Sequence, residues 1–216
     1  MKTSKLKVAI IGLGNIGKVV ASNLVKGNRE VILADKDFAK AKDLAENLGT
    51  LAKPAQIADA IKSADVVVLS VYFASIKEIF VQYASELQGK IIVDPSNPIA
   101  PDDKGGFKKI IGQNESSGQI LSTLLPKNAR LAKALGTLGA ATLESAAFSN
   151  PRKVEFYATD DNSINTEIES LIKDNGFEPV RLGGLDKSIS IEVFGDLHEF
   201  GALGKAITLE EATAKI

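Results

Sequence analysis

The stretch "KVAIIGLGNIGKVVASNL", residues 7–24, carries the strongest structural signal in this chain. Gly12, Gly14 and Gly17 form the spacing G-x-G-x-x-G between a short apolar run and a stretch with helical periodicity. A glycine turn that joins a strand to a helix binds the phosphates of a dinucleotide, because backbone N–H groups at the helix N-terminus point at the anion. The stretch therefore predicts a strand–turn–helix unit with a nucleotide-binding turn.

The same residues also contain most of the triphosphate-binding pattern G-x-x-x-x-G-K-[ST], through Gly12, Gly17 and Lys18. That pattern requires a serine or threonine after the lysine, because its hydroxyl binds magnesium. Val19 stands there and has no oxygen to offer. The dinucleotide interpretation is therefore favoured over a P-loop, and a glycine turn that binds nothing is the third alternative.

The dinucleotide pattern also asks for an acidic residue about 20 positions further on, at the end of the second strand. Asp35 lies there, directly after the run "EVILA". Its carboxylate is suited to accept the ribose hydroxyls of NAD, and it would repel the 2′-phosphate of NADP. Lys36 would attract that phosphate, but Asp37 offsets it. We expect NAD or NADP as the cofactor, with NAD favoured.

Short β-branched runs alternate with helical stretches along the rest of the chain. We expect strands at 6–12, 30–34, 65–71, 90–94, 130–135, 154–159 and 177–182, and helices at 16–26, 38–48, 57–63, 75–87, 119–125, 140–147 and 163–175. Continuous apolar strands between helices indicate a parallel sheet covered on both faces. The expected fold class is α/β, a doubly wound Rossmann sheet, mostly parallel, with a small C-terminal extension.

This fold divides the chain into two expected parts. Residues 1–149 would form the NAD(P)-binding Rossmann domain, and residues 150–216 a small C-terminal subdomain on the substrate side, separate from the first or continuous with it. The polar, glycine-rich stretch 99–118 is expected to be a long loop, and the tail from Gly183 shows no clean periodicity.

Ligands of doubly wound sheets bind at the carboxyl ends of the strands. The cofactor-binding residues that we expect at these ends are Gly12, Leu13, Gly14, Asn15, Ile16 and Gly17 in the turn, Asp35 and Lys36 after the second strand, and Ser70, Val71, Tyr72, Asn97 and Pro98 after two later strands. Alternatively, Tyr72 is a packing aromatic and Asn97-Pro98 a simple turn.

His198 is the only side chain in the sequence whose ordinary pKa lies near neutrality. It is the candidate catalytic residue, placed to protonate or polarise a reduced ring. A surface or interface histidine is the more ordinary interpretation of its position.

The composition of the chain argues against several classes of function and partner. The chain has 216 residues, 44% of them hydrophobic, with a net charge of −1, no cysteine and one histidine. These numbers exclude disulfides, thiolate chemistry and iron–sulfur ligands, and they argue against a metal site. With no basic block and no apolar run of membrane-spanning length, we expect no nucleic-acid or membrane partner and a cytoplasmic location. The apolar tail is compatible with a homodimer.

Five further motifs occur in an order typical of one family. They are "VDPSNP" (93–98), "AKALGTLGAATL" (132–143), "VEFYATDD" (154–161), "NGFEPVRLGGLD" (175–186) and "SIEVFGDLHEFG" (190–201). With the glycine turn, they make the chain resemble the NADP oxidoreductases dependent on coenzyme F-420, a deazaflavin, and related reductases such as the cytoplasmic domains of the STEAP metalloreductases. The resemblance implies hydride transfer between nicotinamide C4 and a deazaflavin or flavin ring.

The chain departs from that family at two places. NADP-using members tend to have Ser-Arg where this chain has Asp35-Lys36, and the family's Lys-Ala-Phe-Asn-Thr appears here as "KALGT" at 133–137. The first departure bears on the cofactor and the second on the acceptor. We therefore expect an NAD(P)-dependent oxidoreductase that acts on a flavin- or deazaflavin-like ring, or on another small acceptor.

Two other functions stay open. A dehydrogenase of the β-hydroxyacid or pyrroline-carboxylate reductase type would add a long helical dimerisation domain, for which the residues after Asn150 leave little room. A nucleotide-binding sensor or regulator without turnover is compatible with the lack of an evident acid–base pair. Sustained NAD(P)H oxidation with a flavin or deazaflavin would distinguish an enzyme from a sensor.

Overall fold

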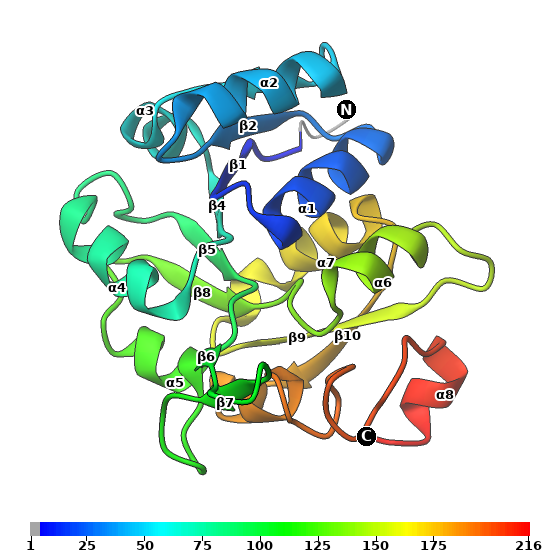
Figure 1. Cartoon of the computed structure of the whole chain (residues 1–216). Coiled ribbons are helices and arrows are strands. Elements are labelled where there is room, and N and C mark those ends of the chain that lie inside the picture. Colours follow the sequence, from blue (N-terminus) through cyan, green and yellow to red (C-terminus); the bar gives the residue numbers. More distant parts are fainter. Residues whose placement is uncertain (1–4) are drawn as a thin grey trace.

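The computed structural model describes residues 5–216 as one eight-stranded sheet with helices on both faces (Figure 1). The strands of this sheet are β1 (Val8–Ile11), β2 (Val31–Ala34), β3 (Ala52–Pro54), β4 (Val66–Leu69), β5 (Ile91–Asp94), β8 (Arg130–Lys133), β9 (Val154–Thr159) and β10 (Glu178–Gly183). The α-helices are α1 (Asn15–Lys26), α2 (Phe38–Leu48), α3 (Ile57–Ser63), α4 (Phe73–Gln82), α5 (Ser117–Ser122), α6 (Ala140–Ser145), α7 (Asn165–Asp174) and α8 (Leu209–Thr213). Two 3-10 helices, η1 (Asn162–Ile164) and η2 (Leu185–Ile191), and an antiparallel pair, β6 (Ile99–Pro101) and β7 (Phe107–Lys109), complete the list.

The strand order of the sheet is β10-β9-β8-β5-β4-β1-β2-β3. Every neighbouring pair is parallel except β8 and β9. The chain builds outward from β1 through β2 to β3 and then returns to the other side of β1 with β4, so the order reverses there. Ligands of such sheets bind in the crevice at this switch point. The predicted Rossmann-type α/β class is confirmed.

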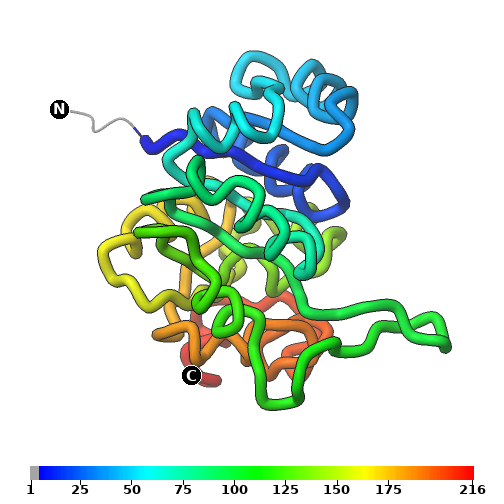
Figure 2. Tube along the Cα trace, turned by 90° about the vertical axis from the view of Figure 1, so that its left-hand side faces the viewer, coloured from blue at the N-terminus to red at the C-terminus, as the bar shows by residue number. Residues whose placement is uncertain are grey.

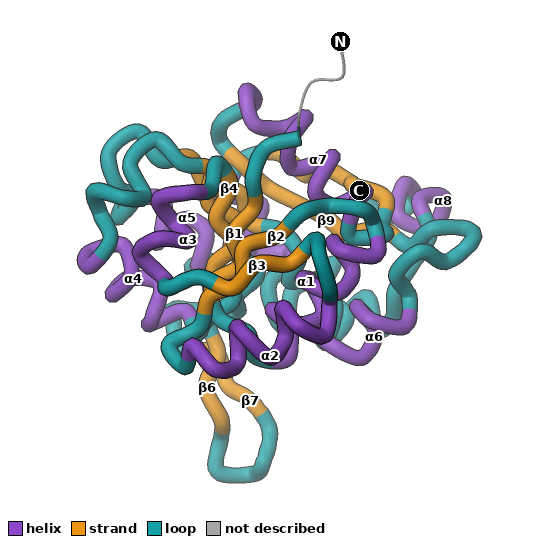
Figure 3. Tube along the Cα trace, turned by 90° about the horizontal axis from the view of Figure 1, so that it is seen from above, coloured by secondary structure: helices purple, strands orange, loops and turns teal. Residues whose placement is uncertain are grey.

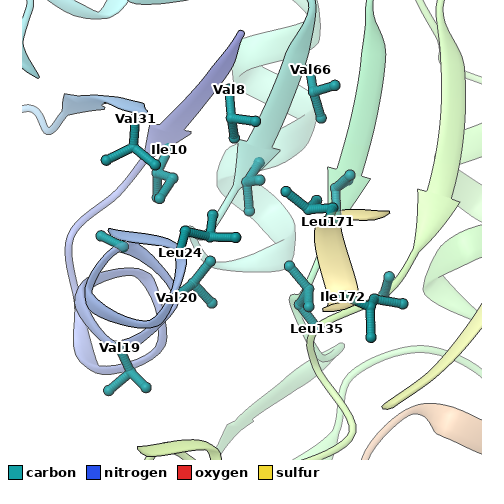
Figure 4. Packing of buried hydrophobic residues seen from close by; sticks show 14 of the residues in the cluster. Val8, Ile10, Val19, Val20, Leu24, Val31, Val66, Leu135, Leu171 and Ile172 are labelled. Carbon is teal, nitrogen blue, oxygen red and sulfur yellow. The ribbon is translucent and has the colours of Figure 1, made fainter. Parts of the chain in front are cut away.

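Strand β1 shows why the sheet is covered on both faces, since alternate side chains of a strand point in opposite directions. Val8 and Ile10 belong to a core cluster with apolar residues of α1, α2, α6 and α7, part of which Figure 4 shows. Ala9 and Ile11 belong to a second cluster with residues of α3, α4 and α5. Both faces of β1 are therefore buried, which explains the absence of polar alternation in "VAII".

The segment 150–216 is built onto the same sheet. It contributes β9 and β10 next to β8, and its remaining part packs on these two strands. A third core cluster makes this contact, with Ile191, Leu197, Leu203, Ile207 and Ala212 against Val154, Phe156, Ala158 and Val180. The segment after the expected boundary at 149 thus shares its sheet with the first part of the chain.

Three segments differ from the expectation. The stretch 99–118 contains the β6–β7 hairpin and the start of α5, and the hairpin extends away from the rest of the molecule (Figures 2 and 3). Both strands of that hairpin are short and partly exposed, so they leave no hydrophobic pattern. No strand was expected at 52–54, but the edge strand β3 lies there and ends at Pro54, which an edge strand tolerates. Helix α4 starts at Phe73 and ends at Gln82, short of the expected 87.

Candidate functional site

The glycine turn between β1 and α1 lies against the end of β4. Gly12 has φ +91°, which favours glycine, and a Cβ there would lie 2.4 Å from the carbonyl oxygen of Ser70. A Cβ on Gly17 would lie 2.0 Å from the carbonyl oxygen of Gly12. The protein's own packing therefore requires both glycines, because they bring α1 close to the two strands.

Gly14 differs, because the described part of the chain gives no internal reason for a glycine there. Its backbone is extended, and an added Cβ would have no heavy atom of residues 5–216 within 4 Å. Gly14 is also the N-cap of α1, and no described side chain caps the first N–H groups of that helix. An uncapped helix N-terminus beside an open glycine suits a pyrophosphate. The residues present therefore fit a dinucleotide.

Asp35 follows β2 and is mostly buried, at 9% exposure. Its Oδ2 accepts a hydrogen bond from the Leu13 N–H at 2.8 Å, and its Oδ1 accepts one from the Asp37 N–H at 3.0 Å. These bonds fix the carboxylate beside the glycine turn, while each oxygen keeps a lone pair for a ribose hydroxyl. Lys36, the next residue, is exposed.

Residues 70–72 connect β4 to α4 beside the turn. The Ser70 N–H donates to the carbonyl oxygen of Ile11 at 2.8 Å, and Ser70 and Val71 are both half-buried. Tyr72 is 85% exposed and is the N-cap residue of α4. Its ring is therefore not a packing aromatic, and it is accessible to a ligand.

The side chain of Asn97 joins three segments of the chain. Its Nδ2 donates to the carbonyl oxygen of Gly136 at 3.2 Å, and its Oδ1 accepts from the Val193 N–H at 2.7 Å. Pro98, which follows, is buried. The amide thus holds the loop after β5, and a hydrogen bond from it to a nicotinamide would have to displace one of these partners.

His198 is 1% exposed, so it is neither a surface histidine nor an accessible acid. Its Nδ1 accepts from the Phe200 N–H at 2.9 Å, and its Nε2 lies 3.0 Å from the carbonyl oxygen of Gly136. This pattern assigns a neutral ring with the proton on Nε2. Burial lowers the pKa of His198 to about 4, so the ring stays neutral at pH 7. The geometry favours a role in holding the Gly136 carbonyl.

Glu155 in β9 contacts the loop that follows β8. Its Oε2 accepts a hydrogen bond from Thr137 Oγ1 at 2.6 Å, and its Oε1 is buried with no hydrogen-bond partner among the described residues. Burial raises the pKa of the Glu155 carboxyl to about 8, against the lowering effect of the Thr137 hydrogen bonds. At neutral pH this carboxyl is therefore mostly protonated.

A cavity of about 490 Å³ opens beside the glycine turn, within the usual range for a small-molecule site. Three phenylalanines on its wall are more than half exposed: Phe107 at 59%, Phe194 at 52% and Phe200 at 60%. The other lining residues are Asn15, Ile16, Pro95, Asn97, Ile99, Gly136, Leu138, Gly139, Ala140, Val193 and His198. The wall thus combines the start of α1, the loops after β5 and β8, the hairpin and the C-terminal segment.

The wall of this cavity is largely apolar. No acidic or lysine or arginine side chain is among the described residues that line it. The side chains of Asn97 and His198 are hydrogen-bonded within the protein. Asn15, at the first position of α1, is exposed and offers its amide to a ligand. The cavity is therefore suited to an uncharged ring held by stacking on aromatic side chains.

The predicted site residues thus fall into two neighbouring groups. The residues of the glycine turn, Asp35, Ser70 and Val71 form a strip along the ends of β1, β2 and β4, whereas Asn15, Ile16, Asn97 and His198 belong to the cavity. Tyr72 and Lys36 are exposed beside the strip. The first two residues of α1 belong to the turn and to the cavity wall, and they connect the two groups.

The family resemblance linked residues 133–137 to the acceptor, but no residue of the loop 136–140 and none of the three phenylalanines was predicted as a site residue. The loop could have been found, because it follows the predicted strand 130–135 and ligands gather at strand ends. No pattern marks the phenylalanines as exposed, since Phe107 lies in a polar stretch and the others in a segment without periodicity.

The described residues contain neither a candidate metal site nor a membrane-spanning helix. Within 5–216, no group of three or more His, Asp or Glu side chains is placed to hold a metal ion. No helix in this part of the chain is long and apolar enough to cross a membrane.

The known proteins that this chain resembles in sequence are reductases. A family model described as NADP oxidoreductase, coenzyme F420-dependent, matches residues 7–98. The F420-dependent NADP reductase of Methanothermobacter thermautotrophicus is 26% identical over 204 residues, which cover 89% of this chain and 87% of that protein. The metalloreductase STEAP3 of Rattus norvegicus is 24% identical over 186 residues, and the matched part is 86% of this chain but 36% of that longer protein.

Among solved structures, a hypothetical protein, SMa0349 from Sinorhizobium meliloti, has a TM-score of 0.81 and 30% identity, with 94% of this chain and 95% of that chain covered. The mostly parallel sheet and the similarity to F420-dependent NADP reductases identify the chain as a Rossmann-type oxidoreductase. The chain resembles the NADP oxidoreductases that depend on coenzyme F420, whose family model matches residues 7–98. The predicted family resemblance is confirmed.

Proposed function

We propose that this protein binds a nicotinamide nucleotide along the strip of strand ends and passes hydride between it and a planar ring in the cavity. The observation that carries this proposal is the double role of Asn15 and Ile16, which belong to the nucleotide-binding turn and also line the cavity. A dinucleotide whose pyrophosphate lies at Gly14 therefore reaches the cavity with its nicotinamide end. The acceptor is flavin-like or deazaflavin-like, in keeping with the names of the relatives.

Hydride transfer between two rings asks little of side-chain acids and bases. The nicotinamide supplies the hydride, and the protein holds the two carbons at near-attack distance and keeps water out, which can supply about 7–11 kcal/mol. Phe107, Phe194 and Phe200 line the cavity and provide apolar surface for such a ring. The neutral, fully hydrogen-bonded His198 fits this arrangement as part of the wall.

We further propose that NAD(H) is preferred over NADP(H), although the family description and the relative named above specify NADP. A 2′-phosphate carries a charge of about −1.5 to −2, and it would lie beside Asp35, which the Leu13 N–H holds in place. Lys36 is the adjacent cation, and Asp37 lies next to it. Removal of the Asp35 carboxylate, as in Asp35→Ser, should shift the affinity ratio toward NADP(H).

The experiment begins with calorimetric titration of NADH and NADPH, followed by steady-state oxidation with a panel of acceptors. The panel contains FMN, a deazaflavin and an uncharged quinone, so that it separates ring types at one cavity. We expect turnover with at least one planar ring and tighter binding of NADH. Tighter binding of NADPH would contradict the assignment of Asp35, without affecting the rest of the proposal.

The same experiment separates an enzyme from a nucleotide sensor. Nucleotide binding without turnover across the whole panel would favour the sensor and would overturn hydride transfer as the function. A cytoplasmic location and a homodimer are further predictions from the sequence, and light scattering in solution tests the second.

A further inference from the structure

A buried lysine lies between the ends of β5 and β8, the two strands whose following loops line the cavity. Lys133, the last residue of β8, is 2% exposed, and its Nζ forms an ion pair of 2.8 Å with Asp94 Oδ2 at the end of β5. The ammonium also donates to the Ser96 carbonyl oxygen and, at 2.9 Å, to Ser117 Oγ. All three of its donors therefore have partners inside the protein.

Ser117, the first residue of α5, extends this contact to the C-terminal segment. Its Oγ donates to Glu192 Oε1 at 2.8 Å, and the Gly118 N–H donates to the same oxygen at 3.3 Å. Glu192 is 1% exposed and directly precedes Val193 and Phe194, which line the cavity. Lys133, Ser117 and Glu192 thus form one buried chain of contacts, which we call the lysine link.

The lysine link is one of several contacts that hold the C-terminal wall of the cavity, since His198 also contacts the Gly136 carbonyl oxygen and the Glu199 N–H donates to the Thr137 carbonyl oxygen. Glu192 Oε2 has no hydrogen-bond partner among residues 5–216, so this carboxylate is held through Oε1 alone, by Ser117 and the Gly118 N–H. The Val193 N–H donates to Asn97 Oδ1 at 2.7 Å and provides a second attachment. Phe194 has φ +74°, an uncommon backbone conformation that persists only where neighbours hold it.

Both attachments lead to the loop after β5. The lysine link reaches that loop through Asp94 and Ser96, and the second attachment reaches it through Asn97. Pro95 and Asn97 of this loop line one part of the cavity, and Val193 and Phe194 line another. The link is therefore one of the contacts that set the spacing between these two parts of the wall.

We propose that Lys133, Ser117 and Glu192 are positioning residues for the acceptor, which they hold at the correct distance by fixing the Phe194 wall against the loop after β5. None of the three lines the cavity, so they act through Val193 and Phe194. This inference rests on the proposed function, because it assigns the cavity to the acceptor.

The first test is Ser117→Ala, which cuts the link and leaves the Lys133–Asp94 ion pair in place. We expect the acceptor KM to rise about tenfold, because a displaced Phe194 wall binds the acceptor less tightly in the ground state and the transition state alike. The nucleotide Kd should stay unchanged, since the glycine turn is untouched. Ser122→Ala in the same helix is the matched control, because its hydroxyl donates within the helix to the Gln119 carbonyl oxygen.

A double-mutant cycle distinguishes positioning from general damage. Glu192→Ala should raise the acceptor KM as Ser117→Ala does, and the double variant should be no worse than either single variant, because both cut one link. Glu192→Gln keeps an acceptor oxygen for Ser117 and should restore most of the affinity. Additive effects, or no rescue by glutamine, would contradict the link. Lys133→Met is less useful, because it leaves Asp94 buried without a cation.

Amide hydrogen exchange gives a readout that does not depend on turnover. In Ser117→Ala we expect faster exchange at residues 192–198 and unchanged exchange in α1. Unchanged exchange at 192–198 would overturn the inference whether or not the wild-type protein turns over. Faster exchange with a normal acceptor KM would also overturn it, whereas a wild-type protein that oxidises no nucleotide would contradict the proposed function instead.

Discussion

Gly14 and Gly17 lie three positions apart in one turn, and they are glycines for different reasons. A Cβ on Gly17 would collide with the Gly12 carbonyl oxygen at 2.0 Å, whereas a Cβ on Gly14 would contact no described atom within 4 Å. Gly17 is therefore needed for the fold, and we propose that Gly14 is needed for a ligand that approaches the backbone. Sequence spacing predicts both positions but does not tell these two reasons apart.

This difference predicts different results for two variants. Gly14→Val should lower the free energy of unfolding by only about 0.5–1 kcal/mol, since valine is a poor N-cap residue, and weaken nucleotide binding by about 100-fold or more, which is about 2.7 kcal/mol. Gly17→Ala should lower the free energy of unfolding by about 1–3 kcal/mol or more, because it overpacks the helix–strand contact. Calorimetry and thermal melts of both proteins test this, and wild-type affinity in Gly14→Val would rule out the pyrophosphate site.

Glu155 and His198 predict the pH dependence of stability. The Glu155 pKa is raised from 4.5 to about 8, so the stability gained from its protonated form is complete below pH 4.5 and is lost as the pH rises to 8. The His198 pKa is lowered from 6.5 to about 4, so the stability gained from its neutral form is complete above pH 6.5 and is lost as the pH falls to 4. The two effects oppose each other between pH 4.5 and 6.5.

Above pH 6.5 the contribution of His198 to stability no longer changes, so of these two groups only Glu155 changes the free energy of unfolding. Between pH 6.5 and 8 the wild-type protein should lose about 2 kcal/mol of unfolding free energy through this group, at ~1.4 kcal/mol for each pH unit. Glu155→Gln, which cannot ionise, should lose much less over the same range. Denaturant unfolding of both proteins at pH 6.5 and 8 measures the difference, and equal slopes would show that Glu155 is ionised in the folded state.

At the scale of elements, prediction works best where an element is buried. The strand 154–159 and the helices 38–48 and 57–63 were predicted with the bounds that the structure has, because their apolar residues repeat at the period of a strand or helix. The β6–β7 hairpin gave no such signal. It is short and partly exposed, and the contacts that make it part of the cavity come from tertiary structure.

We predict that the β6–β7 hairpin contributes to acceptor binding through Phe107, which lines the cavity and is 59% exposed. Phe107→Ala should raise the acceptor KM about fivefold to tenfold through lost stacking, equivalent to ~1–1.4 kcal/mol, with no change in nucleotide affinity. Stability should change little because the side chain is mostly in solvent. Ile110→Ala is the control, since Ile110 is also exposed, follows the same hairpin and is not among the lining residues. An equal effect of both substitutions would contradict the role of the ring.

At the scale of the whole molecule, the strand order brings the predicted cofactor-binding residues to the carboxyl ends of neighbouring parallel strands. The alternation of elements predicted this placement, because the fold rule fixes where ligands bind. It could not predict that the C-terminal segment returns to cover β9 and β10, since that packing depends on residues far apart in sequence. His198 and Glu192 are buried by the same return of the chain, which explains why their burial was not foreseen.

Because β9 and β10 belong to the main sheet, we predict that residues 5–216 unfold in one cooperative transition. Leu203→Ala, in the cluster that attaches the C-terminal segment, should lower the stability of the whole protein by about 2–4 kcal/mol. Denaturation followed by circular dichroism and by tyrosine fluorescence should give coincident curves for both proteins. Two separate transitions would show that the C-terminal segment is an independent unit.

The most direct test of hydride transfer is a single turnover with a nicotinamide nucleotide that carries deuterium on one face of C4. The acceptor is a deazaflavin, whose reduced ring carbon keeps the transferred atom. We expect deuterium in the reduced deazaflavin from one of the two C4 stereoisomers and hydrogen from the other, because the nicotinamide at the strand ends presents one face to the cavity. Oxidation without label in the product, or label from both isomers equally, would contradict a direct transfer inside this cavity.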